Sequence, residues 1–184
     1  MKKKLFILFL LIGGLTIQSQ NKKIDSLEIL LKHLESDKEK ISILNQLSWE
    51  YNLISNFDAC IKAAESSIQL NKNMNSDLSS SYHHIGDAYY AKGNFDKALQ
   101  SHIKSLEISE KLKNNTGILA SYTSIGAVYM GIGNNSMSKE YYNKSLDLSN
   151  EIKDKKGKAN ALISLGNLNY IEGDYSKSEE LYLK

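Results

Sequence analysis

The 184-residue sequence contains no arginine and no proline, and Cys60 is its only cysteine. The lack of arginine excludes bidentate clamps on phosphate, carboxylate or guanine, because lysine offers only a point charge. The lack of proline means that no residue forces a helix to break and that no rigid proline-rich linker divides the chain. A single cysteine cannot form an internal disulfide. These absences favour one continuous helical domain that folds without covalent cross-links.

Lysine supplies all of the positive charge, and it nearly balances the acidic residues. The whole chain has a formal charge of +2, but three of its 23 lysines lie in the opening MKKK. Residues 21–184 carry 20 lysines against 21 acidic residues, a net charge of −1. A nearly neutral body with mixed charges has no basic face for nucleic acid or for an anionic membrane. We therefore expect no nucleic-acid partner for this segment.

The first 20 residues have the order of features that is typical of a signal peptide. MKKK is positive, the apolar run LFILFLLIGGLTI spans 13 residues, and small and polar residues follow up to Ser19 and Gln20. The run is shorter than the roughly 20 residues that span a bilayer, but it fits the apolar part of a signal peptide. A buried core helix is the alternative. The sequence predicts a signal peptide at 1–20 and an exported protein in the periplasm or another extracytoplasmic space.

The rest of the chain repeats itself about every 40 residues. Tyr82, Ile85 and Gly86 begin the clearest copy. The same pattern returns twice, at Tyr122, Ile125, Gly126, Leu162, Leu165 and Gly166. An earlier copy, offset by 38 residues, has Ser48 in the place of the glycine. Because apolar residues, glycine and turn residues recur while the histidines do not, the histidines are additions to a repeated framework.

Each copy is predicted to form two antiparallel helices joined by a turn. Apolar residues within 82–90 fall on one helical face, and Gly93-Asn94 then interrupts the pattern before a second helix. Glycine inside a helix costs about 1 kcal/mol relative to alanine, so Gly86 should mark a close approach of the partner helix, where a Cβ would collide. The matching small residues of the second helices are Cys60, Ala98, Ser138 and Ser178. Cys60 is therefore interpreted as a packing residue and not as a reactive thiol.

This pattern resembles the tetratricopeptide repeat family. Besides the residues above, the resemblance rests on Tyr51, Tyr89 and Tyr129, each three positions after the glycine or its serine substitute. It implies an all-α fold, an α-solenoid of helix-turn-helix repeats with a period of about 40 residues, where the family's usual period is about 34. The family's helix-ending proline is missing. The expected parts are a leading or capping helix at 21–40 and repeats at 41–78, 79–118, 119–158 and 159–184.

The last predicted repeat is incomplete, because its second helix has run only from Tyr175 to Lys184 where the sequence stops. Repeat arrays need a polar terminal cap, and each apolar side chain left uncovered forfeits roughly 1.5–3 kcal/mol. We expect the sequence to be the front part of a longer protein. Self-association through the uncapped repeat is the alternative. Contact with a membrane is expected only through the signal peptide or through a segment beyond Lys184.

No metal, cofactor or catalytic site is expected. His83 and His84 are adjacent and point about 100° apart on a helix, and no HExxH or CxxC spacing supplies a third ligand. His84 and His102 are interpreted as packing or boundary residues. Gly131 to Gly133 end a helix instead of following a strand, so they are not a phosphate loop. No serine lies in a nucleophile-elbow pattern.

The resemblance also implies a concave groove lined by the first helix of each pair. The side chains expected in it are aromatic, amide, thioether and other mostly uncharged groups, which suit an extended or helical peptide. They are Asn45, Trp49, Asn52, His83, Asp87, Tyr90, Thr123, Ala127, Met130, Ile163, Asn167 and Tyr170. The alternative is that Trp49 and the tyrosines only complete the packing between repeats.

The function expected from these features is non-catalytic binding of a protein or peptide. A signal peptide, a short leading helix and long Lys- and Asn-rich repeats resemble the front part of signalling proteins of the Bacteroidetes type. That resemblance implies a later transmembrane helix and a histidine kinase or DNA-binding output domain. A stand-alone periplasmic adaptor is the second hypothesis. An enzyme is the third, and it would require a cluster of titratable groups brought together in space.

Overall fold

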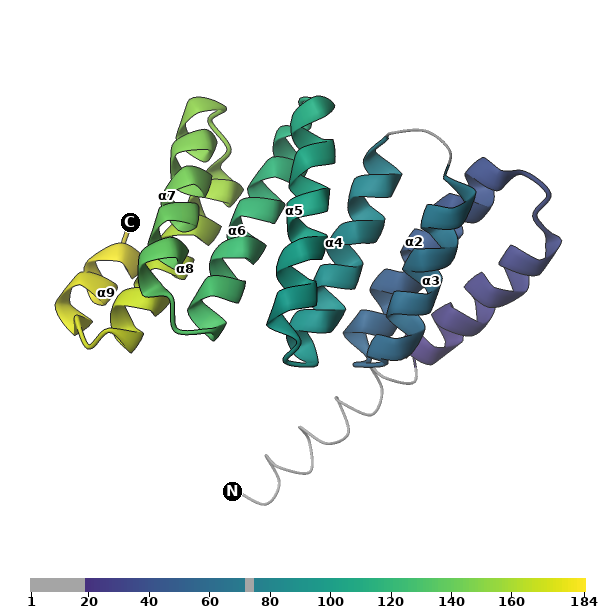
Figure 1. Cartoon of the computed structure of the whole chain (residues 1–184), viewed down its shortest axis with the longest axis horizontal. Coiled ribbons are helices and arrows are strands. Elements are labelled where there is room, and N and C mark those ends of the chain that lie inside the picture. The colour runs from purple at the N-terminus through teal and green to yellow at the C-terminus, as the bar shows by residue number, and fades with distance from the viewer. Residues whose placement is uncertain (1–18, 72–74) are drawn as a thin grey trace, which may run out of the picture.

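The structure, a computed structural model, describes residues 19–71 and 75–184 as a row of helices joined by short turns (Figure 1). A leading helix occupies residues 19–33. The pairs that follow are α2 (Asp37–Leu53) with α3 (Phe57–Leu70), α4 (Ser76–Ala91) with α5 (Phe95–Lys111), α6 (Asn115–Gly131) with α7 (Asn135–Glu151), and α8 (Lys155–Ile171) with α9 (Tyr175–Tyr182). The predicted all-α solenoid of helical hairpins is confirmed.

Most of the predicted signal peptide, residues 1–18, lies outside the described residues. Among the helices that are described, none is both long enough and apolar enough to cross a membrane.

Side chains of asparagine and aspartate set where the helices begin. Each helix from α3 to α9 follows a residue whose side-chain oxygen accepts a hydrogen bond from a backbone N–H two or three positions ahead. These residues are Asn56, Asn75, Asn94, Asn114, Asn134, Asp154 and Asp174. Such a cap contributes about 1 kcal/mol. The pairs begin at residues 37, 76, 115 and 155, three or four positions before the starts expected from the apolar pattern.

The turns between helices depend on residues with positive φ. Within the hairpins this residue is Gly93, Gly133 or Gly173 in the last three pairs, but Ser55 (φ 60°) in the first. The predicted turn at Gly93-Asn94 is therefore found, with φ of 73° at Gly93. Between hairpins, Lys113 and Lys153 hold φ of 53° and 57°. A side chain in this left-handed region costs roughly 1–2 kcal/mol.

Contacts between hairpins curve the array toward the first helices. The first helices α2, α4, α6 and α8 each contact the next first helix along the row, in addition to the sequential neighbours that all helices contact. No such contact joins the second helices α3, α5, α7 and α9 within the described chain. These contacts place the first helices on the inner, concave side of the row of paired helices that Figure 1 shows.

The leading helix packs on the first hairpin. Ile24 and Leu27 form one buried cluster with Leu44 and Leu47 of α2 and Ala63 of α3. This helix thus covers the apolar side of the first pair, in the way that a capping element protects the end of a repeat array.

An aromatic ring from the second helix, and not its backbone, occupies the space beside Gly86, Gly126 and Gly166. A Cβ on Gly86 would lie 2.5 Å from Cε1 of His102. The corresponding atom near a Cβ on Gly126 or Gly166 is Cε1 of Tyr142 or Tyr182, also at 2.5 Å. A Cβ at these glycines would therefore collide with the second helix, as expected. The group that it would meet is an aromatic side chain of that helix and not its backbone. The first hairpin reverses the arrangement with Ser48 and Ala64, both fully buried.

The small residues predicted to face the glycines lie one helical turn before these rings. Cys60, Ala98 and Ser138 are 0% exposed and Ser178 is 2% exposed. They are buried within the hairpins, as expected for small residues that pack between paired helices.

Candidate functional site

The predicted groove residues lie on the first helices, and most of them are at least partly open to solvent. Trp49, Ile163 and Tyr170 are 46%, 50% and 60% exposed. Asn167 is also exposed, and the others apart from Asn45 are half-buried. These half-buried residues are Asn52, His83, Asp87, Tyr90, Thr123, Ala127 and Met130. Whether this surface binds a ligand stays a prediction.

Asn45 departs from the prediction, because it is only 8% exposed. Its side-chain Nδ2 donates to the carbonyl of Asp77 at 3.1 Å, and its Oδ1 accepts from Ser81 at 2.7 Å. The Asn45 amide therefore links α2 to α4 through two hydrogen bonds, and its role is packing between repeats.

Two shallow pockets indent this row of side chains. One, of about 340 Å³, lies among α4, α6 and the start of α8 and includes His83, Thr123 and Asn160. The other, of about 370 Å³, includes Trp49 and His84 beside the leading helix. The predicted groove is thus an uneven surface with separate depressions.

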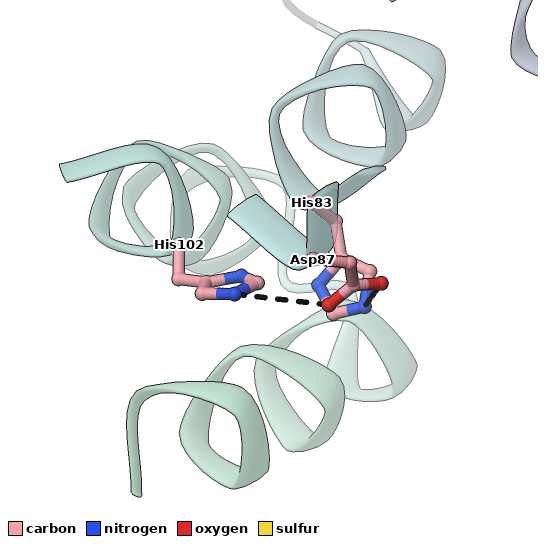
Figure 2. A group of neighbouring side chains, drawn as sticks. All are labelled: His83, Asp87 and His102. Atoms are coloured by element: carbon pink, nitrogen blue, oxygen red, sulfur yellow. Dashed lines mark ion pairs between the residues drawn. The ribbon is translucent and has the colours of Figure 1, made fainter. Parts of the chain in front are cut away.

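Two histidines and an aspartate converge between α4 and α5. His83 and Asp87 lie one turn apart on α4, and His102 reaches them from α5, as Figure 2 shows. His83 Nε2 is 3.5 Å from Asp87 Oδ2, and His102 Nε2 is 3.7 Å from Asp87 Oδ1. The side chains of His83 and Asp87 are 22% and 26% exposed, whereas that of His102 is 1% exposed. We call these three residues the His83–Asp87–His102 cluster.

Burial controls the protonation of this cluster. Burial, followed by the charge of His83, lowers the pKa of His102 to about 3, so that its imidazole is neutral at pH 7. Burial raises the pKa of Asp87, and the neighbouring His83 partly opposes this shift. The cluster therefore offers an uncharged ring on its inner side and a partly desolvated carboxyl group in its centre.

The sequence prediction placed His83 and Asp87 on one face but missed the third member. His102 lies on a different helix, where it was interpreted as a packing or boundary residue. The signal that could have found it is the comparison of repeats: Tyr142 and Tyr182 occupy the equivalent position in the next two hairpins. The histidine at this position therefore distinguishes the α4–α5 hairpin from the two hairpins that follow it.

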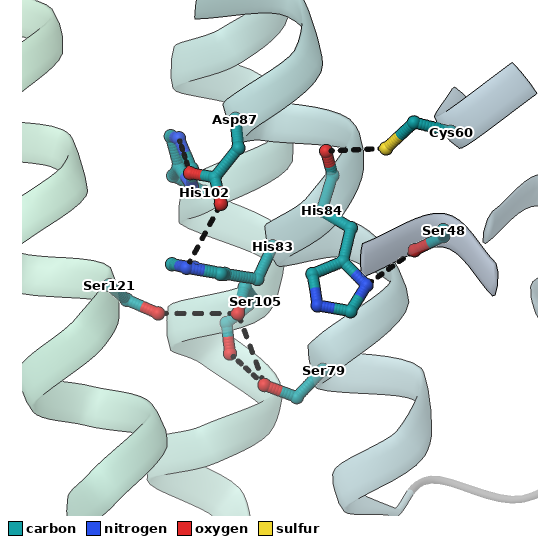
Figure 3. A network of polar contacts seen from close by, with 9 residues as sticks. All are labelled: Ser48, Cys60, Ser79, His83, His84, Asp87, His102, Ser105 and Ser121. Carbon is teal, nitrogen blue, oxygen red and sulfur yellow. Dashed lines mark hydrogen bonds and ion pairs between the residues drawn. The ribbon is translucent and has the colours of Figure 1, made fainter. Parts of the chain in front are cut away.

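His84 belongs to a separate set of contacts, drawn in Figure 3. Its Nδ1 lies 2.5 Å from Ser48 Oγ, and its backbone carbonyl accepts from Cys60 Sγ at 3.6 Å. Burial, then the charge of His83, lowers the pKa of His84 to about 4. These contacts hold α2 and α3 against α4, as expected for a packing histidine. Burial also raises the pKa of Cys60 to about 12, which agrees with a packing role for the thiol.

Buried serines join the hairpins below the cluster. Ser79 Oγ lies 3.1 Å from Ser105 Oγ, and Ser121 donates to Ser105 at 3.2 Å (Figure 3). Ser79 Oγ also lies 2.6 Å from Ser109 Oγ. All of these hydroxyls are buried and satisfied. They fix the spacing of α4, α5 and α6, and so the position of the cluster above them.

Comparison with known proteins agrees with this architecture. Residues 77–151 and 117–184 match the family model described as tetratricopeptide repeat. No curated protein matches the chain significantly.

Several solved structures are similar in fold at low sequence identity. The apo form of RapI has a TM-score of 0.75 and 16% identity over 90% of this chain and 61% of its own. A Rap protein complexed with competence and sporulation factor has a TM-score of 0.80 and 19% identity over 93% of this chain and 49% of its own. Aspartyl phosphate phosphatase F from Bacillus subtilis has a TM-score of 0.80 and 14% identity, with coverages of 92% and 46%. The chain thus spans about half to three fifths of the length of these proteins.

Proposed function

Because the chain belongs to the tetratricopeptide repeat family, we propose that it binds a segment of a protein or peptide on the concave side of its solenoid and catalyses no reaction. Arrays of this kind present extended concave surfaces made by successive repeats. Repeats of this family are typically protein-interaction modules, and the family match names no catalytic activity.

The observation that carries the proposal is the chemistry of the inner surface. Among the predicted groove residues, most side chains are aromatic, amide, hydroxyl, thioether or aliphatic, and Asp87 is the only carboxylate. Aromatic groups are enriched and charged groups depleted at the centres of protein interfaces. Such a surface fits a largely uncharged stretch of polypeptide.

Two of the aromatic groups are held in place before any partner arrives. Tyr90 contacts Phe95 with ring centroids 5.7 Å apart, and Tyr170 contacts Tyr175 at 5.2 Å. Tyr170 nevertheless keeps 60% of its surface exposed. Rigid, exposed aromatic side chains lose little conformational entropy on binding, which makes them effective anchors. Packing and recognition are thus compatible roles for the same rings.

The structural relatives support binding of a partner by this fold. One of them was solved as a Rap protein complexed with competence and sporulation factor. Its identity to this chain is 19%, so it supports the capacity of the fold and leaves the identity of the partner open.

The cellular setting that we propose is an extracytoplasmic signalling protein. The support is the signal-peptide pattern of residues 1–20 and the resemblance of the chain to the front part of Bacteroidetes-type regulators. In that setting the solenoid is the sensory or scaffolding part, and a histidine kinase or DNA-binding domain supplies the output. A stand-alone periplasmic adaptor is the second candidate. Protease accessibility in intact and osmotically shocked cells would test the location, and protection in both would oppose export.

Capture of a partner from a periplasmic extract tests the binding surface. We expect Trp49→Ala and Tyr170→Ala to reduce capture of one discrete partner by about tenfold each, as removal of an anchoring side chain does at interfaces. Asn143→Ala, an exposed change on the outer helix α7, is the matched control and should leave capture unchanged. Equal capture by all three variants would reject the concave surface as the binding site.

A further inference from the structure

The His83–Asp87–His102 cluster has the composition of a metal site and occurs in one hairpin only. The corresponding residues of the next hairpin are Thr123, Ala127 and Tyr142, and those of the last are Ile163, Asn167 and Tyr182. The first hairpin has Asn45, Trp49 and Ala64. Because the repeat framework is built without these groups three times, packing of the hairpin does not require them here.

His102 is a buried imidazole that lacks the hydrogen bonds such a group normally makes. Its Nδ1 has no hydrogen-bond partner among the described residues, and its Nε2 faces only the Asp87 carboxylate, at 3.7 Å. That distance is too long for a hydrogen bond. Because Nε2 makes no hydrogen bond to Asp87, its lone pair is available to an ion when Nδ1 carries the proton.

The separations within the cluster resemble those between the ligands of one small cation. Zinc bonds of about 2.0–2.1 Å in a tetrahedral arrangement place neighbouring ligand atoms about 3.3 Å apart. His83 Nε2 and His102 Nε2 lie 3.5 and 3.7 Å from the two oxygens of Asp87, and all three ligand atoms lie within 4.8 Å of one another. A small rotation of the two partly exposed side chains closes the remaining gap, while His102 is held by its ring contact with Gly86.

From these contacts we propose that His83, Asp87 and His102 bind one divalent cation of the zinc class. Two imidazoles and one carboxylate select zinc, cobalt or nickel over magnesium or calcium, which prefer oxygen ligands. His83 also lines the pocket of about 340 Å³, and the side chains of His83 and Asp87 are 22% and 26% exposed, so an ion can reach the cluster from solvent.

Direct titration tests the site. The full chain, freed of affinity-tag histidines and stripped with a chelator, is titrated with zinc chloride by calorimetry, and cobalt chloride is followed by its visible absorption. We expect one ion per chain and the intense absorption bands of tetrahedral cobalt. Absence of stoichiometric binding, or only the weak bands of octahedral cobalt, would overturn the proposal.

Substitutions taken from the neighbouring hairpin provide matched variants. His83→Thr, Asp87→Ala and His102→Tyr each install the residue that the third hairpin tolerates at that position, and each should weaken binding by at least about tenfold. His33→Ala, on the exposed part of the leading helix, should leave it unchanged. Circular dichroism checks the fold of every variant. If His102→Tyr fails to fold, Asp87→Ala still decides the matter, and wild-type affinity in that variant would contradict the site.

Discussion

Tyr142 fills the space in which a side chain at position 126 would lie. A Cβ on Gly126 would be 2.5 Å from Cε1 and 2.6 Å from Cδ1 of the tyrosine, both closer than real Cβ contacts come. Tyr142 is 2% exposed and its ring is enclosed by α6, α7 and α8, so it cannot swing away. The glycine and the ring therefore form a single packing unit within the hairpin.

We expect Gly126→Ala to destabilise the protein. Overpacking of a closed site costs about 1–3 kcal/mol, and the gain of about 1 kcal/mol in helix propensity offsets only part of it. The net loss should be up to about 2 kcal/mol, measurable by urea unfolding followed by circular dichroism.

Gly166→Ala is the matched control for this substitution. Its Cβ would meet Tyr182 at the same 2.5 Å, but Tyr182 is 48% exposed and can rotate into solvent. Gly166→Ala should leave the free energy of unfolding unchanged or raise it by up to about 1 kcal/mol, because the gain in helix propensity then outweighs the cost of a small displacement. A larger loss at position 166 than at position 126 would contradict the explanation.

Ser55 is a position where the protein can be stabilised. It holds φ of 60° in the turn where the later hairpins have Gly93, Gly133 and Gly173. Ser55→Gly removes a backbone strain of roughly 1–2 kcal/mol. The larger entropy that glycine loses on folding offsets about 0.5–1 kcal/mol of this stabilisation. We expect a net stabilisation of about 0.5–1 kcal/mol and a rise in Tm. The reverse change, Gly133→Ser, should lower Tm by a similar amount, and a fall with Ser55→Gly would refute the strain.

The fold could be predicted from sequence because its determinants are local and repeated. Gly86, Gly126 and Gly166 recur at a fixed spacing, and an asparagine or aspartate begins nearly every helix. The caps act within one turn of the chain, and the glycines recur at a fixed spacing, so both signals can be read from the sequence without knowledge of the three-dimensional packing.

The candidate site could be predicted only in part, because its contacts cross between helices. The face of α4 that carries His83 and Asp87 follows from helical periodicity. The arrival of His102 depends on which residue of α5 lies over Gly86, and the burial of Asn45 depends on how closely α4 packs on α2. Neither the angle between helices nor the spacing between hairpins is encoded in a pattern of single residues.

The ion pair between Lys23 and Glu50 should anchor the leading helix. Lys23 Nζ lies 2.5 Å from Glu50 Oε1, and the glutamate side chain is only 5% exposed. Lys23→Ala leaves that carboxylate buried without its partner, which should cost about 1–2 kcal/mol after allowance for the exposed lysine. Hydrogen exchange of residues 19–33 would show the helix loosening.

Glu50→Gln provides the test of this cause. In the double variant Lys23→Ala/Glu50→Gln the buried group is neutral, so part of the lost stability should return. If the double variant is less stable than Lys23→Ala alone, the loss comes from the lysine's packing and not from an unpaired charge.

Cys60 should be protected from thiol reagents in the folded protein. Burial raises its pKa from 9.0 to about 12, with the charge of Asp87 as a smaller cause. Because only the thiolate reacts, a rise of about three pKa units lowers the reactive fraction about 1,000-fold at pH 8 relative to the unfolded chain. The rate of reaction with a disulfide reagent, with and without urea, measures this difference.

The same shift gives stability a definite pH dependence at high pH. Folding holds the thiol proton more tightly, so the contribution of Cys60 is fully present below pH 9 and is lost as pH rises toward about 12. Cys60→Ala, which resembles Ala98 at the equivalent position of the next hairpin, should flatten this part of the profile. Equal reaction rates of Cys60 in the folded and unfolded chains would contradict this prediction. They would show that α3 separates readily from α4 in the folded protein.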